Sequence, residues 1–151
     1  MSALLSLSVA LNAFLLSMAI FNAITIIRPR SQSSQNLSFS LLVPCRNEAE
    51  NATELVASLG ALDHPNFEVI FIDDNSTDGT GDLLRQAIAS HPSMKVISAA
   101  QLPDGWMGKP WALQQGYLKS SGEIIVTLDA DVRLTSTAIS QAVAMLGDSS
   151  F

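Results

Sequence analysis

Beyond residue 38, short apolar runs alternate with segments in which apolar residues recur at helical spacing. Alternation of this kind is typical of a parallel α/β sheet with right-handed crossovers. Ligands of such sheets bind outside the carboxyl ends of the strands, so the residues after each strand are candidate site residues. The pattern predicts strands over residues 39–44, 67–73, 94–98 and 123–129, and helices over residues 47–62, 79–90, 110–120 and 136–146.

The first part of the chain differs from this pattern, because residues 4–27 contain no charged residue. A helix needs about 20 residues to cross the hydrocarbon region of a bilayer. The alternative is a cleaved signal peptide, but such a peptide has a basic segment before its apolar run. Here Arg28 and Arg30 follow the run instead. This flank favours a retained, single-pass membrane anchor with the α/β domain facing the cytoplasm.

Composition adds two limits on the function of the chain. The formal net charge is −6 and the pI is about 4.6, so nothing indicates a nucleic-acid partner. The single cysteine, Cys45, cannot form an internal disulfide, as expected in a reducing compartment. The sequence divides into an anchor with its basic flank (1–30), a polar linker (31–38) and the α/β domain (39–151).

Acidic residues gather where the predicted strands end. The stretch IIVTLDADVR places two aspartates one residue apart after a buried strand. An isolated pair there is commonly turn chemistry, and Asp78 is expected to be the N-cap of the following helix. A cluster of carboxylates in one crevice instead requires a divalent metal or protonation. The carboxylates are Glu48, Asp74, Asp129 and Asp131, and the nearby cations are Arg46, Lys109 and Arg133.

Four motifs together carry a family resemblance: LLVPCRNEAEN, VIFIDDNSTDGT, GWMGKPWALQQGY and IIVTLDAD. Over about residues 39–146, the chain resembles the nucleotide-binding half of inverting family 2 glycosyltransferases of the GT-A fold. The resemblance implies a partial, Rossmann-like GT-A domain preceded by one transmembrane helix. It also implies transfer of a sugar from a nucleotide-diphosphate sugar to an acceptor. The GWMGKPWA segment is most similar to membrane glycosyltransferases of hopanoid or carotenoid lipids, which implies a lipid-type acceptor.

The resemblance also implies a role for individual residues. In the family, the second acid of the D-D-x-S pair, Asp74 here, binds the imide N–H of uracil. The first acid of the D-x-D, Asp129, lies near the ribose hydroxyls, and Asp131 binds Mg²⁺ or Mn²⁺ together with the diphosphate. The implied nucleotide-binding residues are Pro44, Arg46, Glu48, Asp73, Asp74, Lys109 and Asp129.

The family's catalytic base is an acidic residue in a later segment, so we expect it beyond Phe151. The chain alone is therefore expected to be a truncated, inactive half-domain. Two alternatives remain at this point. One is a non-catalytic, membrane-anchored nucleotide-binding remnant. The other is a haloacid dehalogenase-like phosphatase, although that motif expects Thr or Val where Arg133 stands and normally opens its fold.

The anchor leads to a prediction about topology. A reporter fused after Ser38 should remain on the cytoplasmic side, because positive charge beside a membrane span tends to stay in the cytoplasm. Activity of a fused cytoplasmic reporter, with no activity of a periplasmic one, would agree with this orientation. Glycosylation or periplasmic activity of the reporter would contradict it.

Overall fold

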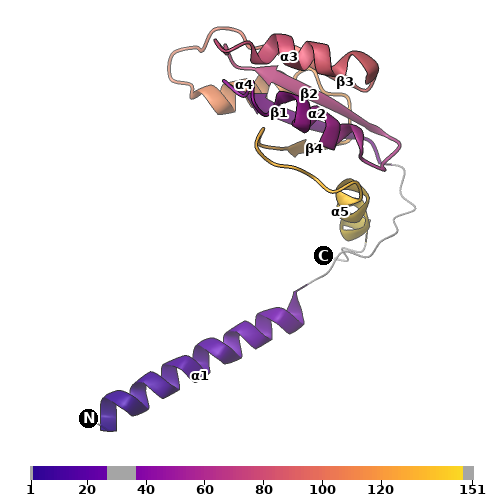
Figure 1. Ribbon diagram of the computed structural model, residues 1–151. Coiled ribbons are helices and arrows are strands. Elements are labelled where there is room, and N and C mark those ends of the chain that lie inside the picture. Colours follow the sequence, from indigo (N-terminus) through magenta and orange to yellow (C-terminus); the bar gives the residue numbers. More distant parts are fainter. Residues whose placement is uncertain (1, 27–36, 148–151) are drawn as a thin grey trace.

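The computed structural model describes residues 2–26 and 37–147, and it confirms the predicted alternation of strands and helices. The N-terminal helix α1 stands apart from a sheet flanked by the other helices (Figure 1). The strands are β1 (Phe39–Cys45), β2 (Phe67–Asp73), β3 (Met94–Ser98) and β4 (Ile124–Thr127). The helices are α1 (Ser2–Thr25), α2 (Ala52–Gly60), α3 (Thr80–Ala87), the 3₁₀ helix η1 (Ile88–Ser90), α4 (Gly108–Tyr117) and α5 (Ala138–Gly147).

The four strands form one parallel sheet in the order β3-β2-β1-β4. The register pairs Phe39 with Phe67 at one end of β1 and Cys45 with Asp73 at the other. On the far side of β2, Asp73 pairs with Ser98 of β3. These three strands therefore end level with one another, and the loops that follow them emerge at one edge of the sheet.

Alternate residues of the central strand β1 pack into two separate apolar clusters. Leu41 and Val43 face one layer, which includes Leu55 and Leu59 of α2. Leu42 faces the other layer, which is built on α4. Because both faces of the sheet are covered, β1 and β2 read as continuous apolar runs rather than alternating ones.

The structure corrects the predicted ends of several elements. The helix predicted from residue 47 begins at Ala52, and the one predicted over 79–90 is α3 followed by η1. Gly79, with φ 90°, occupies the N-cap of α3, so Asp78 lies one residue before the cap that was predicted for it. The helix predicted over residues 110–120 begins at Gly108 and ends at Tyr117. A Cβ on Gly122 would come within 2.6 Å of the backbone of Phe39, so glycine is needed there for close packing.

Helix α1 has the length and composition of a membrane span. Its segment Leu4–Thr25 has a mean hydropathy of 2.1, and none of its most apolar window is buried by the rest of the chain. Large apolar side chains such as Phe14 and Ile24 are exposed. Arg28 and Arg30, on which the predicted orientation rests, lie outside the described residues.

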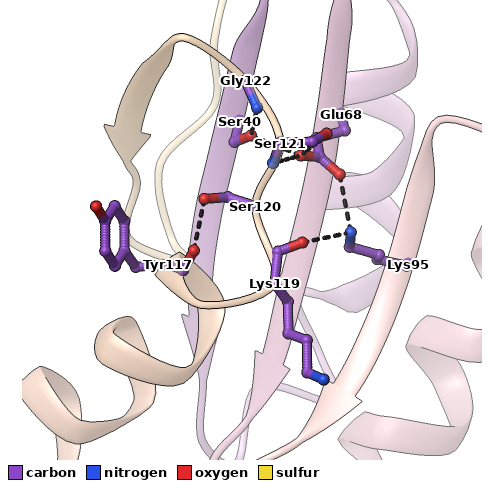
Figure 2. A network of polar contacts seen from close by, with 8 residues as sticks. All are labelled: Ser40, Glu68, Lys95, Tyr117, Lys119, Ser120, Ser121 and Gly122. Atoms are coloured by element: carbon purple, nitrogen blue, oxygen red, sulfur yellow. Dashed lines mark hydrogen bonds and ion pairs between the residues drawn. The ribbon is translucent and has the colours of Figure 1, made fainter.

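A network of polar contacts pins the α4–β4 connection to the amino-terminal half of the sheet, around Glu68 of β2 (Figure 2). Glu68 Oε1 accepts hydrogen bonds from Ser40 Oγ at 2.6 Å and from the Ser121 amide at 2.6 Å. Glu68 Oε2 lies 2.9 Å from Lys95 Nζ, which also donates to the Lys119 carbonyl oxygen at 2.8 Å. The network joins three strands to the loop that delivers β4.

Two opposing effects set the charge state of Glu68. Burial alone would raise its pKa, but hydrogen bonds from Ser40, Lys95 and Ser121 outweigh burial and lower the pKa from 4.5 to about 2. A carboxylate whose pKa is lowered by folding stabilises the fold fully only above its unfolded pKa. This contribution should therefore be lost as the pH falls from about 4.5 towards 2.

Replacing Glu68 tests this network. Glu68→Gln should lower the free energy of unfolding by about 1–3 kcal/mol at neutral pH, because it weakens the charge-assisted hydrogen bonds from Ser40, Lys95 and Ser121. Thermal melts at pH 7 and at pH 3 should show a smaller difference between parent and variant at the lower pH. Equal differences at both pH values would contradict the assignment of the charge.

Candidate functional site

A cavity of about 390 Å³ opens at the carboxyl edge of the sheet. Its walls come from the loops after β1, β2 and β4 and from the start of α4. The lining residues are Pro44, Cys45, Arg46, Glu48, Asp74, Gly108, Lys109, Asp129, Ala130 and Asp131.

The cavity brings together all but one of the predicted site residues. The exception is Asp73, whose carboxylate accepts a hydrogen bond from the Ser76 amide at 3.1 Å and supports the turn after β2. Sequence reasoning missed Cys45, Gly108 and Ala130 as lining residues. Gly108 carried a usable signal, because it directly precedes Lys109; a Cβ there would lie 3.1 Å from a carboxylate oxygen of Asp74.

The loops after β1 and β2 turn in the same way and brace each other. Asn47 and Asn75 each follow the paired strand ends by two residues, and both have φ 55°, in the left-handed region. Asparagine tolerates this region better than most residues. Asn47 Oδ1 accepts a hydrogen bond from the Thr77 amide at 2.9 Å, so the first turn holds the second.

Three consecutive amides of the β1 loop bind side chains of the β2 loop and of the first residue of α3. The Asn47 amide donates to Ser76 Oγ at 3.0 Å and the Glu48 amide to Thr80 Oγ1 at 2.8 Å. The amide of Ala49 donates to Asp78 Oδ2 at 3.0 Å. The hydroxyl of Thr80 also lowers the pKa of Asp78, by donating to its other carboxylate oxygen. The STDGT segment therefore fixes the backbone from which Arg46 and Glu48 project.

The cavity contains two ion pairs and further carboxylates. Arg46 Nη1 lies 3.5 Å from Asp74 Oδ2, and Lys109 Nζ lies 2.5 Å from Asp129 Oδ1. Asp74 is the buried partner, with 12% of its side chain exposed, whereas the side chains of Lys109 and Asp129 are more than half exposed. Glu48 and Asp131 add two carboxylates to this lining. The lining thus carries four carboxylates against two cations.

The two aspartates after β4 lie on a tight turn. The Val132 amide donates to the Asp129 carbonyl oxygen at 3.1 Å and closes it. Ala130 between them is buried, with 4% exposure, whereas both aspartates are exposed. No group of three or more His, Cys, Asp or Glu forms a metal cage within residues 2–26 and 37–147. A pair of carboxylates suits a Mg²⁺-type ion that takes its remaining ligands from phosphate and water.

The start of α4 contributes Gly108 and Lys109 to the lining of the cavity. Met107 is its N-cap, and Pro110 lies in its first turn. Trp106 packs edge-on against Trp111, with ring centroids 5.1 Å apart, and Trp111 Nε1 donates to the Ala100 carbonyl oxygen at 3.1 Å. Neither tryptophan is among the residues that line the cavity.

Comparison with known proteins identifies the family. The model of the family described as "Glycosyl transferase family 2" matches residues 40–150. The chain belongs to glycosyltransferase family 2. A curated member, β-monoglucosyldiacylglycerol synthase of Nostoc sp., is 35% identical over 124 residues, which are 78% of this chain and 26% of that protein. The chain thus spans about a quarter of the length of this relative.

Solved structures show that the fold is GT-A. The mannosyltransferase PcManGT from Pyrobaculum calidifontis, in complex with GDP-Man and Mn²⁺, matches with a TM-score of 0.73 and 24% identity, over 95% of this chain and 44% of that one. S. aureus TarS in complex with UDP-GlcNAc matches with a TM-score of 0.63 and 29% identity, over 74% of this chain and 32% of that one. Family membership favours the glycosyltransferase interpretation over the phosphatase alternative.

Cys45 is one of the residues around the cavity, but its thiol is buried. Its side chain has no exposed surface, and its thiol donates to the Val43 carbonyl oxygen at 3.5 Å. Burial raises the pKa of this thiol to about 12, and the negative charges of Glu48 and Asp73 add to the shift. At neutral pH the group is therefore a thiol, which is a poor nucleophile.

Thiol labelling tests this description of Cys45. We expect Cys45 in the folded chain to resist Ellman's reagent at pH 8 for as long as the fold persists, because the reactive thiolate is suppressed and covered. Addition of guanidinium chloride should release one rapidly reacting thiol per chain. Rapid labelling without denaturant would show that the thiol is accessible.

Proposed function

We propose that the cavity binds the nucleotide diphosphate of a sugar donor, and that the chain carries the donor-binding half of an inverting glycosyltransferase with a lipid-type acceptor. The observation that carries the proposal is the convergence of Asp74, Lys109 and the Asp129–Asp131 turn on one cavity at the carboxyl edge of a GT-A sheet. The complex of the similar TarS with UDP-GlcNAc supports the class of donor. The acceptor class is supported by the similar diacylglycerol-modifying synthase.

In this proposal the base of the nucleotide binds at the β1 and β2 loops. Asp74 is buried, is ion-paired to Arg46 and lines the cavity. An ionised carboxylate only accepts hydrogen bonds, which matches the N–H groups on the edge of a pyrimidine or purine base. Pro44 and Glu48 line the same side. Asp73 supports Asp74 through the turn beneath it.

The diphosphate binds at the other end, between α4 and the turn after β4. The excess of carboxylates over cations in the lining favours a divalent cation, Mg²⁺ or Mn²⁺, before an anionic ligand can enter. When bound, that cation would neutralise the departing nucleoside diphosphate. Asp131 would hold the cation and Asp129 the ribose. Lys109 would move from Asp129 towards base or phosphate oxygens.

We further propose that α1 anchors the enzyme in a membrane, with the α/β domain on the cytoplasmic side and a short linker between them. The support is the length and hydropathy of Leu4–Thr25. Leu37 packs against the sheet core and Ser38 bonds Glu123, so both residues belong to the domain rather than to the linker. An anchor of this kind would keep the cavity close to an acceptor lipid.

Two substitutions test the two ends of the cavity separately. Asp131→Ala should abolish the gain in UDP or GDP affinity that Mn²⁺ gives the parent, because it removes a ligand of the cation. Asp74→Ala should weaken nucleotide binding at least tenfold even without metal, because it removes the acceptor for the base. Isothermal titration calorimetry with and without Mn²⁺ measures both effects.

Asp104→Asn is the matched control, since Asp104 is an exposed acid in the loop before α4 that does not line the cavity. This variant should bind like the parent. Parent-like binding by both Asp74→Ala and Asp131→Ala would overturn the assignment of the cavity.

A further inference from the structure

Arg133 follows the turn of the two aspartates, and its guanidinium group folds back onto that turn. Nη1 donates to the carbonyl oxygen of Ala130 at 2.9 Å and to that of Val132 at 3.1 Å. The hydrogen bond that closes the turn uses the Asp129 carbonyl and leaves that of Ala130 free for Arg133. Arg133 therefore holds the peptide plane between Ala130 and Asp131, within the turn that carries both aspartates.

The other nitrogen of the same guanidinium group binds Asn51, at the start of α2. Nη2 of Arg133 lies 3.2 Å from Asn51 Oδ1 and 3.4 Å from the Asn51 carbonyl oxygen. The Asn51 side-chain nitrogen in turn donates to Glu48 Oε2 at 2.7 Å. Since arginine only donates and an ionised carboxylate only accepts, these partners fix which way the Asn51 amide faces. We call this chain of contacts the Arg133–Asn51–Glu48 link.

The side chain of Asn51 makes this link instead of capping its own helix. It is the N-cap residue of α2, where the asparagine side chain normally accepts a hydrogen bond from an amide of the first turn. Here the side chain makes no such bond, and the backbone lies in the right-handed region, at φ −90° and ψ −20°. The amide group is thus used to join two loops rather than to stabilise its own helix.

The two joined loops form separate walls of the cavity. Glu48 belongs to the wall after β1, and Ala130 with its flanking aspartates belongs to the wall after β4. The paired register of β1 with β4 runs only to Leu42 and Thr127, although β1 continues to Cys45. Past that point the link joins the two walls directly, next to the hydrogen bonds between Ser58 of α2 and the backbone of Leu134.

We propose that Arg133 and Asn51 are positioning residues that hold Glu48 and the aspartate turn at a fixed separation, so that both walls engage one nucleotide-sugar together. This inference rests on the proposed function of the cavity. Arg133 and Asn51 act through Ala130 and Glu48 and do not touch the ligand. A ligand that bridges both walls then binds more tightly, because the loops need not be ordered on binding.

The test uses the full chain in detergent and the variants Asn51→Leu and Arg133→Met. Each should lower the affinity for UDP or GDP in the presence of Mn²⁺ at least tenfold, while the metal-free affinity for uridine or guanosine stays within twofold of the parent. The matched control is Glu54→Gln: Glu54 lies 3.8 Å from Arg133, but its side chain is 82% exposed. This control should bind like the parent.

The double variant separates a shared link from two independent effects. If the link acts as a unit, Asn51→Leu with Arg133→Met should lose no more affinity than the worse single variant. Losses that multiply would overturn the proposal. An equal loss of affinity for nucleosides and nucleoside diphosphates would also overturn it, because that pattern indicates general damage to the fold.

A second measurement does not depend on any nucleotide. Because Glu48 and Arg133 are joined through Asn51, the shifts in melting temperature of Glu48→Gln and Arg133→Met should be non-additive in the parent and additive when Asn51→Leu is present. Additivity in both backgrounds would overturn the positioning role even in a protein that binds nucleotide well. Failure of the parent to bind UDP and GDP with Mn²⁺ would instead refute the proposed function, and the melting cycle would still decide the link.

Discussion

The parallel register of β1 with β2 determines where the loops of the cavity leave the sheet. Because Cys45 pairs with Asp73, the loops after β1 and β2 leave the sheet level with each other, and equivalent asparagines turn both chains. The burial of β1 on both faces makes this register hard to shift, since a slip by one residue would exchange the two apolar layers. Cross-bracing of the loops, and hence the shape of the cavity, depends on this register.

The negative charge of carboxylates is the second constraint, and the structure balances it differently at the two ends of the sheet. At the amino-terminal half, Glu68 is ion-paired to Lys95 and accepts hydrogen bonds from the hydroxyls of Ser40 and Ser121, so its charge is part of the scaffold. At the carboxyl edge, the pairing is incomplete, and the ion pair of Lys109 with Asp129 remains exposed to solvent. Incomplete neutralisation at an accessible edge is what a binding site for a metal and an anion requires.

The sequence predicted the strands and most of the cavity because both follow from local patterns. Apolar runs mark strands buried on both faces, and the carboxyl ends of parallel strands necessarily meet at one edge. The link through Arg133 and Asn51, the anchoring of the α4–β4 loop by Glu68 and the tight approach of Gly122 could not be predicted in this way. Each depends on a contact between segments more than 50 residues apart. Helix α2 begins at Ala52 rather than at residue 47 for a similar reason. Side chains of the β2 loop bind the backbone of residues 47–49 and hold it outside the helix.

The backbone amides of the β1 loop are occupied by contacts within the protein, and this affects how the lining of the cavity can evolve. A glycine-rich phosphate loop recognises its ligand with backbone amides, so its shape and its selectivity cannot vary independently. Here the amides of residues 47–49 bind Ser76, Thr80 and Asp78, and the side chains of Arg46 and Glu48 line the cavity. The conformation of the loop and the lining of the cavity are therefore encoded by different residues. Such a division lets the side chains that line the cavity change one at a time while the loop keeps its conformation.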